Sequence, residues 1–251
     1  LLDKIPMSLF AGLGATSAVL MLVFKDTITG LAAGVRLTSN DMLHKGDWIT
    51  VKSVDANGIV EDMSLTTVKV RNFDNTIVTI SPITLVNGSF QNWIGMQKSG
   101  GRRVKRVVYF DFRSVRLVDE TLKRNLLAKH FATEDSFKLK ESLQKAIDKD
   151  IQEGKDIEDL KNPAALAPTN LQLYRKFMEK YLRQRPEVNT DLTLMVRHME
   201  ATQCGLPIEF YFFIKDKVRV NYEHILADIM EHAYALANEF GLKIYEQYPE
   251  Q

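Results

Sequence analysis

The 251-residue sequence contains a single cysteine, Cys204, and almost no net charge. One cysteine cannot form an internal disulfide, so the chain is not a disulfide scaffold and suits a reducing compartment. The 33 Lys and Arg residues nearly balance the 32 Asp and Glu residues, so no global charge directs the chain towards nucleic acid. The sequence also lacks a starting Met, and we expect the natural protein to continue towards its N-terminus.

Patterns typical of catalysis are scarce as well. His224, Asp228 and His232 recur at four-residue spacing and could share a helical face as metal ligands, but polar surface positions on an amphipathic helix explain them better. Cys204 has no obvious base beside it, which an activated nucleophile needs. No glycine-rich phosphate-binding loop is present. We therefore expect no catalytic residue, no metal and no cofactor.

What the sequence does contain is a long apolar opening. Residues 5–24 read IPMSLFAGLGATSAVLMLVF without one charge. At about 1.5 Å per residue, a helix of this length spans the hydrocarbon core of roughly 30 Å. A secretory signal fits poorly, because no starting Met or clear cleavage site is present. A buried helix of a soluble protein remains an alternative, since Ala and Gly dilute the hydrophobicity, but a membrane helix is favoured.

Charged and small residues divide this helix. Lys25 and Asp26 follow the apolar run, and because charges in a span are costly, we expect the helix to break or bend there. One face carries mostly small residues at helical spacing: Ala11, Ala15, Ala18 and Leu22. A slim face suits a ring of identical helices around a narrow apolar pore, whereas packing within one chain is the alternative. Three glycines allow close approach of helices in lipid: Gly14, Gly30 and Gly34.

Residues 46–93 follow a different pattern. Short segments of alternating β-prone residues are separated by turn signals, among them Asn57-Gly58, which predicts a hairpin turn, and the stretch at 72–75. Pro82 stops the last of these segments. Several short strands at close spacing predict a small β-barrel or Sm-like sheet.

The motifs GLAAG, KGDWI, NGxVE, TT and NTxxxISP occur in that order along residues 30–82. This series resembles the MscS-like family of small-conductance mechanosensitive channels, in which a kinked pore helix leads directly into a β-domain. The KVRNFDNT and SGGRR segments are similar to the miniconductance (YbdG-like) branch. The resemblance covers essentially the whole chain and is strongest at residues 12–103. It implies a membrane-tension-gated ion channel that is not an enzyme.

The resemblance also implies roles for individual positions. Ala18 and Leu22 match the apolar pore seal, and because Ala18 is small, the constriction falls at Leu22 or shifts to a bulkier neighbour such as Phe24. The kink of the family falls on Lys25 and Asp26. Two further positions, Leu20 and Val23, are alternatives for the constriction.

A basic cluster follows the flexible segment at residues 99–101: Arg102, Arg103, Lys105 and Arg106. One interpretation is an electropositive patch beside water-filled side openings, which would favour anions. The alternative is a solvated linker and strand edge. Downstream, strands and helices in the order βα–ββαβ predict a ferredoxin-like α/β sandwich interrupted by an insertion at about residues 133–168.

Together these patterns predict an α+β membrane protein with three parts: a pore-lining helix (1–40), an Sm-like β-domain (41–98) and an α/β vestibule domain (99–251). We expect a homo-oligomer, by resemblance a heptamer, whose partners are the lipid bilayer and permeating ions and not nucleic acid. The expected location is the bacterial inner membrane, with the C-terminal domains in the cytoplasm. Two alternatives stay open: a tension or osmotic sensor with little conductance, and a soluble Sm-like ring that binds nucleic acid.

Overall fold

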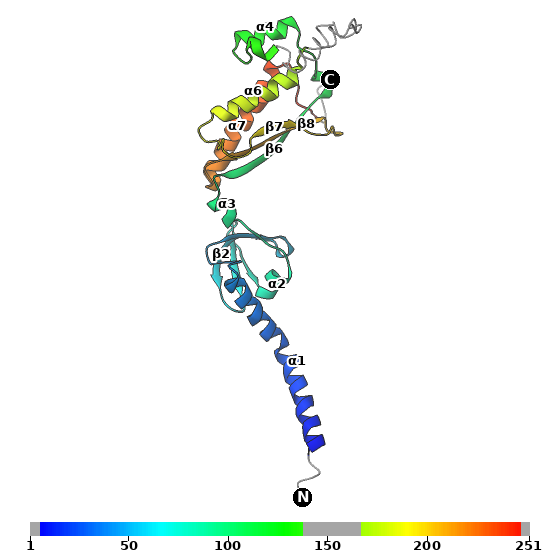
Figure 1. The fold of residues 1–251 in the computed structure, drawn as a ribbon, viewed down its shortest axis with the longest axis vertical. Helices are drawn as coiled ribbons and strands as arrows, with labels where there is room; N and C mark the ends of the chain where they lie inside the picture. Colours follow the sequence, from blue (N-terminus) through cyan, green and yellow to red (C-terminus); the bar gives the residue numbers. More distant parts are fainter. Residues whose placement is uncertain (1–5, 138–166, 247–251) are drawn as a thin grey trace, which may run out of the picture. The chain divides into compact units, whose positions relative to one another are not determined.

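A computed structural model describes residues 6–137 and 167–246, with side chains from residue 10 onwards in the first helix, and the chain divides into the units 1–98 and 99–251 (Figure 1). Each unit is described by itself. Most of the insertion expected at residues 133–168 lies outside the described residues.

The first unit begins with one long helix, α1 (Pro6–Ser39). It runs through Lys25 and Asp26 without interruption, so the break expected there is absent from the structure. The physical reason is that neither side chain is a helix breaker and both are exposed to solvent. The hydroxyl of Thr29 donates to the Lys25 carbonyl over 2.7 Å, which adds a side-chain bond at this level.

The end of α1 is sharply defined. Asp41 takes the left-handed conformation (φ 54°), the Met42 amide donates to the Leu37 carbonyl, and the Asp41 amide donates to the Thr38 carbonyl. These two bonds form a Schellman motif, in which an Asp stands where a glycine is most common. Leu37 itself is fully buried, so the last turn of α1 belongs to the core of the following domain.

That domain is a five-stranded antiparallel sheet in the order β4-β3-β2-β1-β5. The strands are β1 (Trp48–Val51), β2 (Ala56–Met63), β3 (Val68–Asn72), β4 (Ile77–Ile80) and β5 (Gln91–Asn92). The short helices are η1 (Lys52–Val54), α2 (Pro82–Asn87) and α3 (Ile94–Lys98). Alternate residues of β1, β2 and β3 are buried beneath the sheet, as a half-buried strand requires.

The turn expected at Asn57-Gly58 is wrong. Both residues lie inside β2, paired with Thr50 and Ile49 of β1, and the chain turns earlier through η1. Gly58 is needed for a different reason, because a Cβ there would lie 1.9 Å from the Arg71 carbonyl oxygen on β3. The glycine therefore serves a close approach of two strands.

The second unit is a three-stranded sheet with helices on one face (Figure 1). The strands β6 (Arg102–Phe110), β8 (Leu206–Ile214) and β7 (Met195–His198) are antiparallel in the order β6-β8-β7. The helices are η2 (Phe112–Ser114), α4 (Glu120–Ala128), η3 (Glu134–Phe137), α6 (Asn170–Gln184) and α7 (Arg219–Glu239). The expected pairing of β7 with β8 is confirmed, whereas the expected last strand is reduced to one bridge between Ile244 and Phe110.

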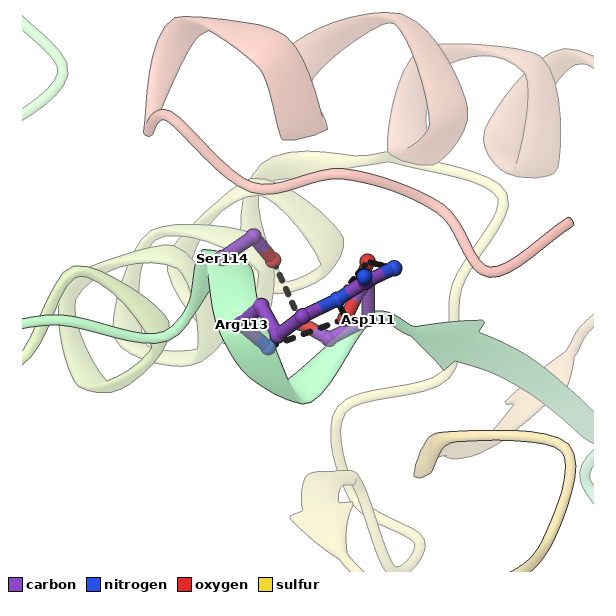
Figure 2. Close-up of polar contacts among 3 residues, drawn as sticks. All are labelled: Asp111, Arg113 and Ser114. Carbon is purple, nitrogen blue, oxygen red and sulfur yellow. Dashed lines mark hydrogen bonds and ion pairs between the residues drawn. The ribbon is translucent and has the colours of Figure 1, made fainter. Parts of the chain in front are cut away.

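Two polar arrangements fix the connections of this unit. Asp111 ends β6 by accepting bonds from the Arg113 amide and guanidinium, while the Ser114 hydroxyl donates to the Asp111 carbonyl (Figure 2). The hydrogen bonds from Arg113 lower the pKa of the Asp111 carboxyl below its ordinary value. The fully buried Asn170 accepts from the Arg116 and Leu171 amides and donates to two further carbonyls. Both arrangements are satisfied by the chain itself and have a structural role.

Candidate functional site

The feature with the clearest functional content is the exposed apolar surface of α1. Among the described residues, α1 is the one helix long and apolar enough to cross a membrane, over Phe10–Ser39. Residues 10–29 are exposed all round the helix, and the exposed fractions reach 74% at Met21 and 75% at Leu22. A core helix of a soluble protein would be mostly buried, so within this chain α1 does not behave as one.

The helix sorts the expected constriction residues onto two faces. At about 100° per residue, Leu22 lies about 40° from Ala18, so these two share a face. Phe24 lies about 160° from Leu22 on the same helix. The structure therefore brings Ala18 and Leu22 together and places Phe24 on the opposite side, because two residues of helix reverse the direction of a side chain.

The expected packing glycines also divide. A Cβ added at Gly14 or Gly30 would meet nothing within 4 Å. A Cβ added at Gly34 would lie 2.4 Å from the Leu65 carbonyl oxygen and 3.0 Å from its carbonyl carbon. Gly34 thus packs against the turn between β2 and β3 of its own domain, beside the buried Ala33.

The turn that receives Gly34 is held in place by hydrogen bonds. The Ser64 hydroxyl accepts from the amides of Thr66 and Thr67, and the Ser64 amide donates to the Thr67 carbonyl over 2.8 Å. A turn fastened in this way resists displacement of the Leu65 carbonyl. The C-terminal end of α1 is therefore attached firmly to the β-domain through Gly34 and Leu37.

The four basic residues of β6 do not form one patch. Successive residues of a strand point to opposite faces, so Arg102 and Arg106 lie on the face that the helices cover, and Arg103 and Lys105 on the other. The Arg102 guanidinium lies 4.1 Å from the centre of the Tyr222 ring. Because the four basic residues are divided between the two faces of the sheet, they do not form the single electropositive patch that was expected.

Sequence reasoning missed a buried charge next to Lys105. Glu209 of β8 has no exposed surface, lies 2.6 Å from the Arg197 guanidinium and 3.6 Å from the Lys105 ammonium. The signal was available, since Glu209 is the only charge in the run LPIEFYFFI, and a charge inside such a run requires partners. Arg197 and Lys105, from the two neighbouring strands, supply the opposite charge that this buried carboxylate requires.

A stack of aromatic rings on the β-domain was also not anticipated. Trp48 and Trp93 stack with ring centres 4.7 Å apart, and Phe73 meets Trp48 edge-on at 5.3 Å. The indole nitrogens donate to Asn57 and Thr50, so the rings fasten β1 to the segment after β5. His224, Asp228 and His232, in contrast, belong to no cluster able to hold a metal within the part of the chain that is described.

Comparison with known proteins gives these features a context. Residues 26–95 match the family model described as the mechanosensitive ion channel β-domain. Over residues 26–95 the chain resembles the β-domain of mechanosensitive ion channels. The resemblance seen in the sequence is confirmed at this level, while the miniconductance branch stays a prediction.

The relatives of this MscS-like chain are distant. It is 34% identical over 85 residues to the small-conductance mechanosensitive channel MscMJ of Methanocaldococcus jannaschii, covering 34% of the chain and 24% of the relative. It is 29% identical over 129 residues to the large-conductance channel MscMJLR of the same organism, covering 51% and 35%. The matched stretch thus spans about a third or less of these curated relatives.

Solved structures show the same fold. The Helicobacter pylori MscS crystal structure, titled as a closed state, matches with a TM-score of 0.61 at 14% identity, covering 99% of the MscS-like chain and 74% of the other. The Arabidopsis thaliana MSL1 structure matches with a TM-score of 0.63 at 11% identity, covering 98% and 68%. An MscS-like fold with an N-terminal apolar helix followed by a β-domain is therefore established.

Proposed function

We propose that the protein is a subunit of an ion channel opened by membrane tension, in which α1 lines the pore. The observation that carries the proposal is the exposed apolar surface of α1 over residues 10–29, directly continuous with a mechanosensitive-channel β-domain. Water cannot be the natural surroundings of such a surface, whereas lipid and further copies of the same helix can. The alternative of a soluble nucleic-acid-binding ring leaves this surface uncovered.

In the proposed channel, the slim face of α1 points to the lumen. Its largest side chain is Leu22, with Ala18 one turn further into the membrane. A narrow ring of leucines excludes water and thereby blocks ions without a physical plug. Membrane tension favours the state that occupies more bilayer area, so it acts as a ligand with higher affinity for the open state. Opening would release ions and small solutes during hypo-osmotic shock.

The finer features are part of the same proposal. By family resemblance, we propose a homoheptamer in the bacterial inner membrane with the domains after α1 in the cytoplasm. Gly14 and Gly30, which have open space around them in a single chain, are available for contacts between neighbouring helices. Bending at Lys25 and Asp26 would be a property of another state of the channel, because α1 is continuous there in this one.

Patch recording with suction ramps tests the proposal in membranes that lack other tension-gated channels. Stepwise currents above a pressure threshold are expected from the full-length protein. Leu22→Ser should lower that threshold, because it removes about 1.5–3 kcal/mol of apolar stabilisation per copy from the closed seal. Gly12→Ser adds the same hydroxyl far from the seal and serves as the matched control. Silence up to patch rupture, with surface expression confirmed, would contradict the channel and favour a sensor role.

A further inference from the structure

Lys25 and Asp26 are two opposite charges within an otherwise apolar helix surface. Both are exposed, and neither has a side-chain ion pair among the residues that the structure describes. They cannot pair with each other on their own helix, because adjacent residues point about 100° apart. Charges at such positions are costly unless water or a partner of opposite sign faces them. Among the described residues no such partner is present, so the same helix of a neighbouring copy is the candidate to supply one.

The directions of the two side chains are set by the continuous helix. The slim face formed by Ala11, Ala15, Ala18 and Leu22 has a mean direction about 30° from Ala18. Lys25 lies about 50° to one side of this direction, and Asp26 lies about 50° to the other side. The two opposite charges thus flank the proposed pore-lining face symmetrically, about one turn below Leu22.

Cyclic symmetry turns this arrangement into a complementary contact. In a ring, one flank of every helix faces the opposite flank of the next helix. With seven members, each neighbour lies about 64° to either side of the direction towards the axis, close to the directions of Lys25 and Asp26. Rotation about the axis leaves heights unchanged, so the two residues differ in level by only about 1.5 Å.

We propose that Lys25 of each copy forms an ion pair with Asp26 of the next copy, closing a ring of alternating charges immediately below the Leu22 constriction. The inference rests on the proposed oligomeric channel and names the contact that joins its helices. The ring carries equal numbers of both signs, so it fixes the spacing and rotation of the helices without imposing a charge preference on the lumen. The charges favour parallel neighbours, because an antiparallel neighbour would place like charges together.

Cysteine cross-linking tests the contact without requiring channel activity. Cys204 is the only cysteine of these 251 residues and is exposed, so Cys204→Ser removes the one thiol of this part of the protein. Treated in membranes with a bis-maleimide cross-linker whose reach matches a lysine–aspartate ion pair, the full-length Lys25→Cys/Asp26→Cys variant should give a ladder of cross-linked multimers that ends at the closed ring, because such a pair holds the two Cβ atoms further apart than a disulfide does. The Val23→Cys/Phe24→Cys variant is the matched control, because its adjacent cysteines point away from the slim face. It should remain largely monomeric.

A charge exchange provides a second, independent measurement. Lys25→Asp alone places only negative charges in the ring and should shift the detergent-solubilised oligomer to smaller species on size exclusion. Lys25→Asp with Asp26→Lys restores alternation and should restore the oligomer. The proposal is overturned if residues 25 and 26 give no ladder, if the control gives an equal ladder, or if the exchange fails to rescue. A ladder from a protein that is silent under suction would refute the channel and support the contact. Currents without a ladder would support the channel and refute the contact.

Discussion

Replacing Gly34 with Ala probes how firmly α1 is attached to the β-domain. The added methyl would lie 2.4 Å from the Leu65 carbonyl oxygen and 3.1 Å from its Cα, distances that require the backbone to move. Since the turn is fastened by the Ser64 hydroxyl, the helix and the turn must separate. Overpacking of this kind costs about 1–3 kcal/mol.

A second effect of the same substitution has the opposite sign. Ala is a better helix former than Gly by about 1 kcal/mol, so part of the steric cost of Gly34→Ala is offset. Gly12→Ala, at a glycine that has no proposed contact, gains the same propensity with nothing within 4 Å of the new methyl. The difference in the free energy of unfolding between the two variants therefore isolates the steric cost of about 1–3 kcal/mol.

Hydrogen exchange in the detergent-solubilised full-length protein measures this difference where it arises. Peptides covering residues 63–68 should lose roughly fivefold or more protection in Gly34→Ala relative to Gly12→Ala, because 1.4 kcal/mol corresponds to a factor of ten. Peptides of the second unit serve as the internal reference. Equal protection of the turn in both variants would refute the idea that Gly34 and Leu65 hold the helix in place.

Two further predictions concern the second unit. Asn170→Ala should lower the free energy of unfolding by about 3 kcal/mol or more in chemical denaturation, because the amides and carbonyls that bond to this one side chain would lose their partner. A loss below about 1 kcal/mol would contradict this. Burial raises the pKa of the Tyr174 hydroxyl, which donates to the Ala233 carbonyl. The contribution of this neutral hydroxyl to the free energy of unfolding is therefore complete below the ordinary tyrosine pKa near 10 and declines as the pH rises towards the folded-state pKa. Tyr174→Phe removes this titration, and its stability should fall less steeply with pH above 10 than that of the wild type; parallel curves would refute it.

Much of the fold could be predicted from periodicity alone. The length and composition of the opening segment predicted α1, and alternation predicted most strands of both sheets. The break at Lys25 and Asp26 could not be judged from sequence, because charge marks a cost in lipid and says little about helical geometry. Asn57-Gly58 was misassigned because the same dipeptide that favours a turn also permits two strands to approach, and only the partner strand at Arg71 distinguishes these cases.

The site shows a similar division. Gly34 was predicted to pack against other helices in lipid, whereas in this chain it meets Leu65, which lies far along the chain on a turn, where no local pattern connects the two. The opposition of Phe24 and Leu22, and of Arg102 and Arg103, followed directly from helical and strand periods. Those periods were already present in the sequence and would have corrected both expectations.

The length of α1 has a mechanical consequence. At about 1.5 Å per residue, its 34 residues extend about 51 Å, well beyond the hydrocarbon thickness of roughly 30 Å. With the end near Gly34 fixed as a fulcrum, Leu22 sits on a lever arm of about 18 Å. Each 10° of tilt then carries Leu22 about 3 Å sideways, which is close to the width of a water molecule. In the proposed channel, a small tilt of α1 would therefore suffice to wet the constriction at Leu22.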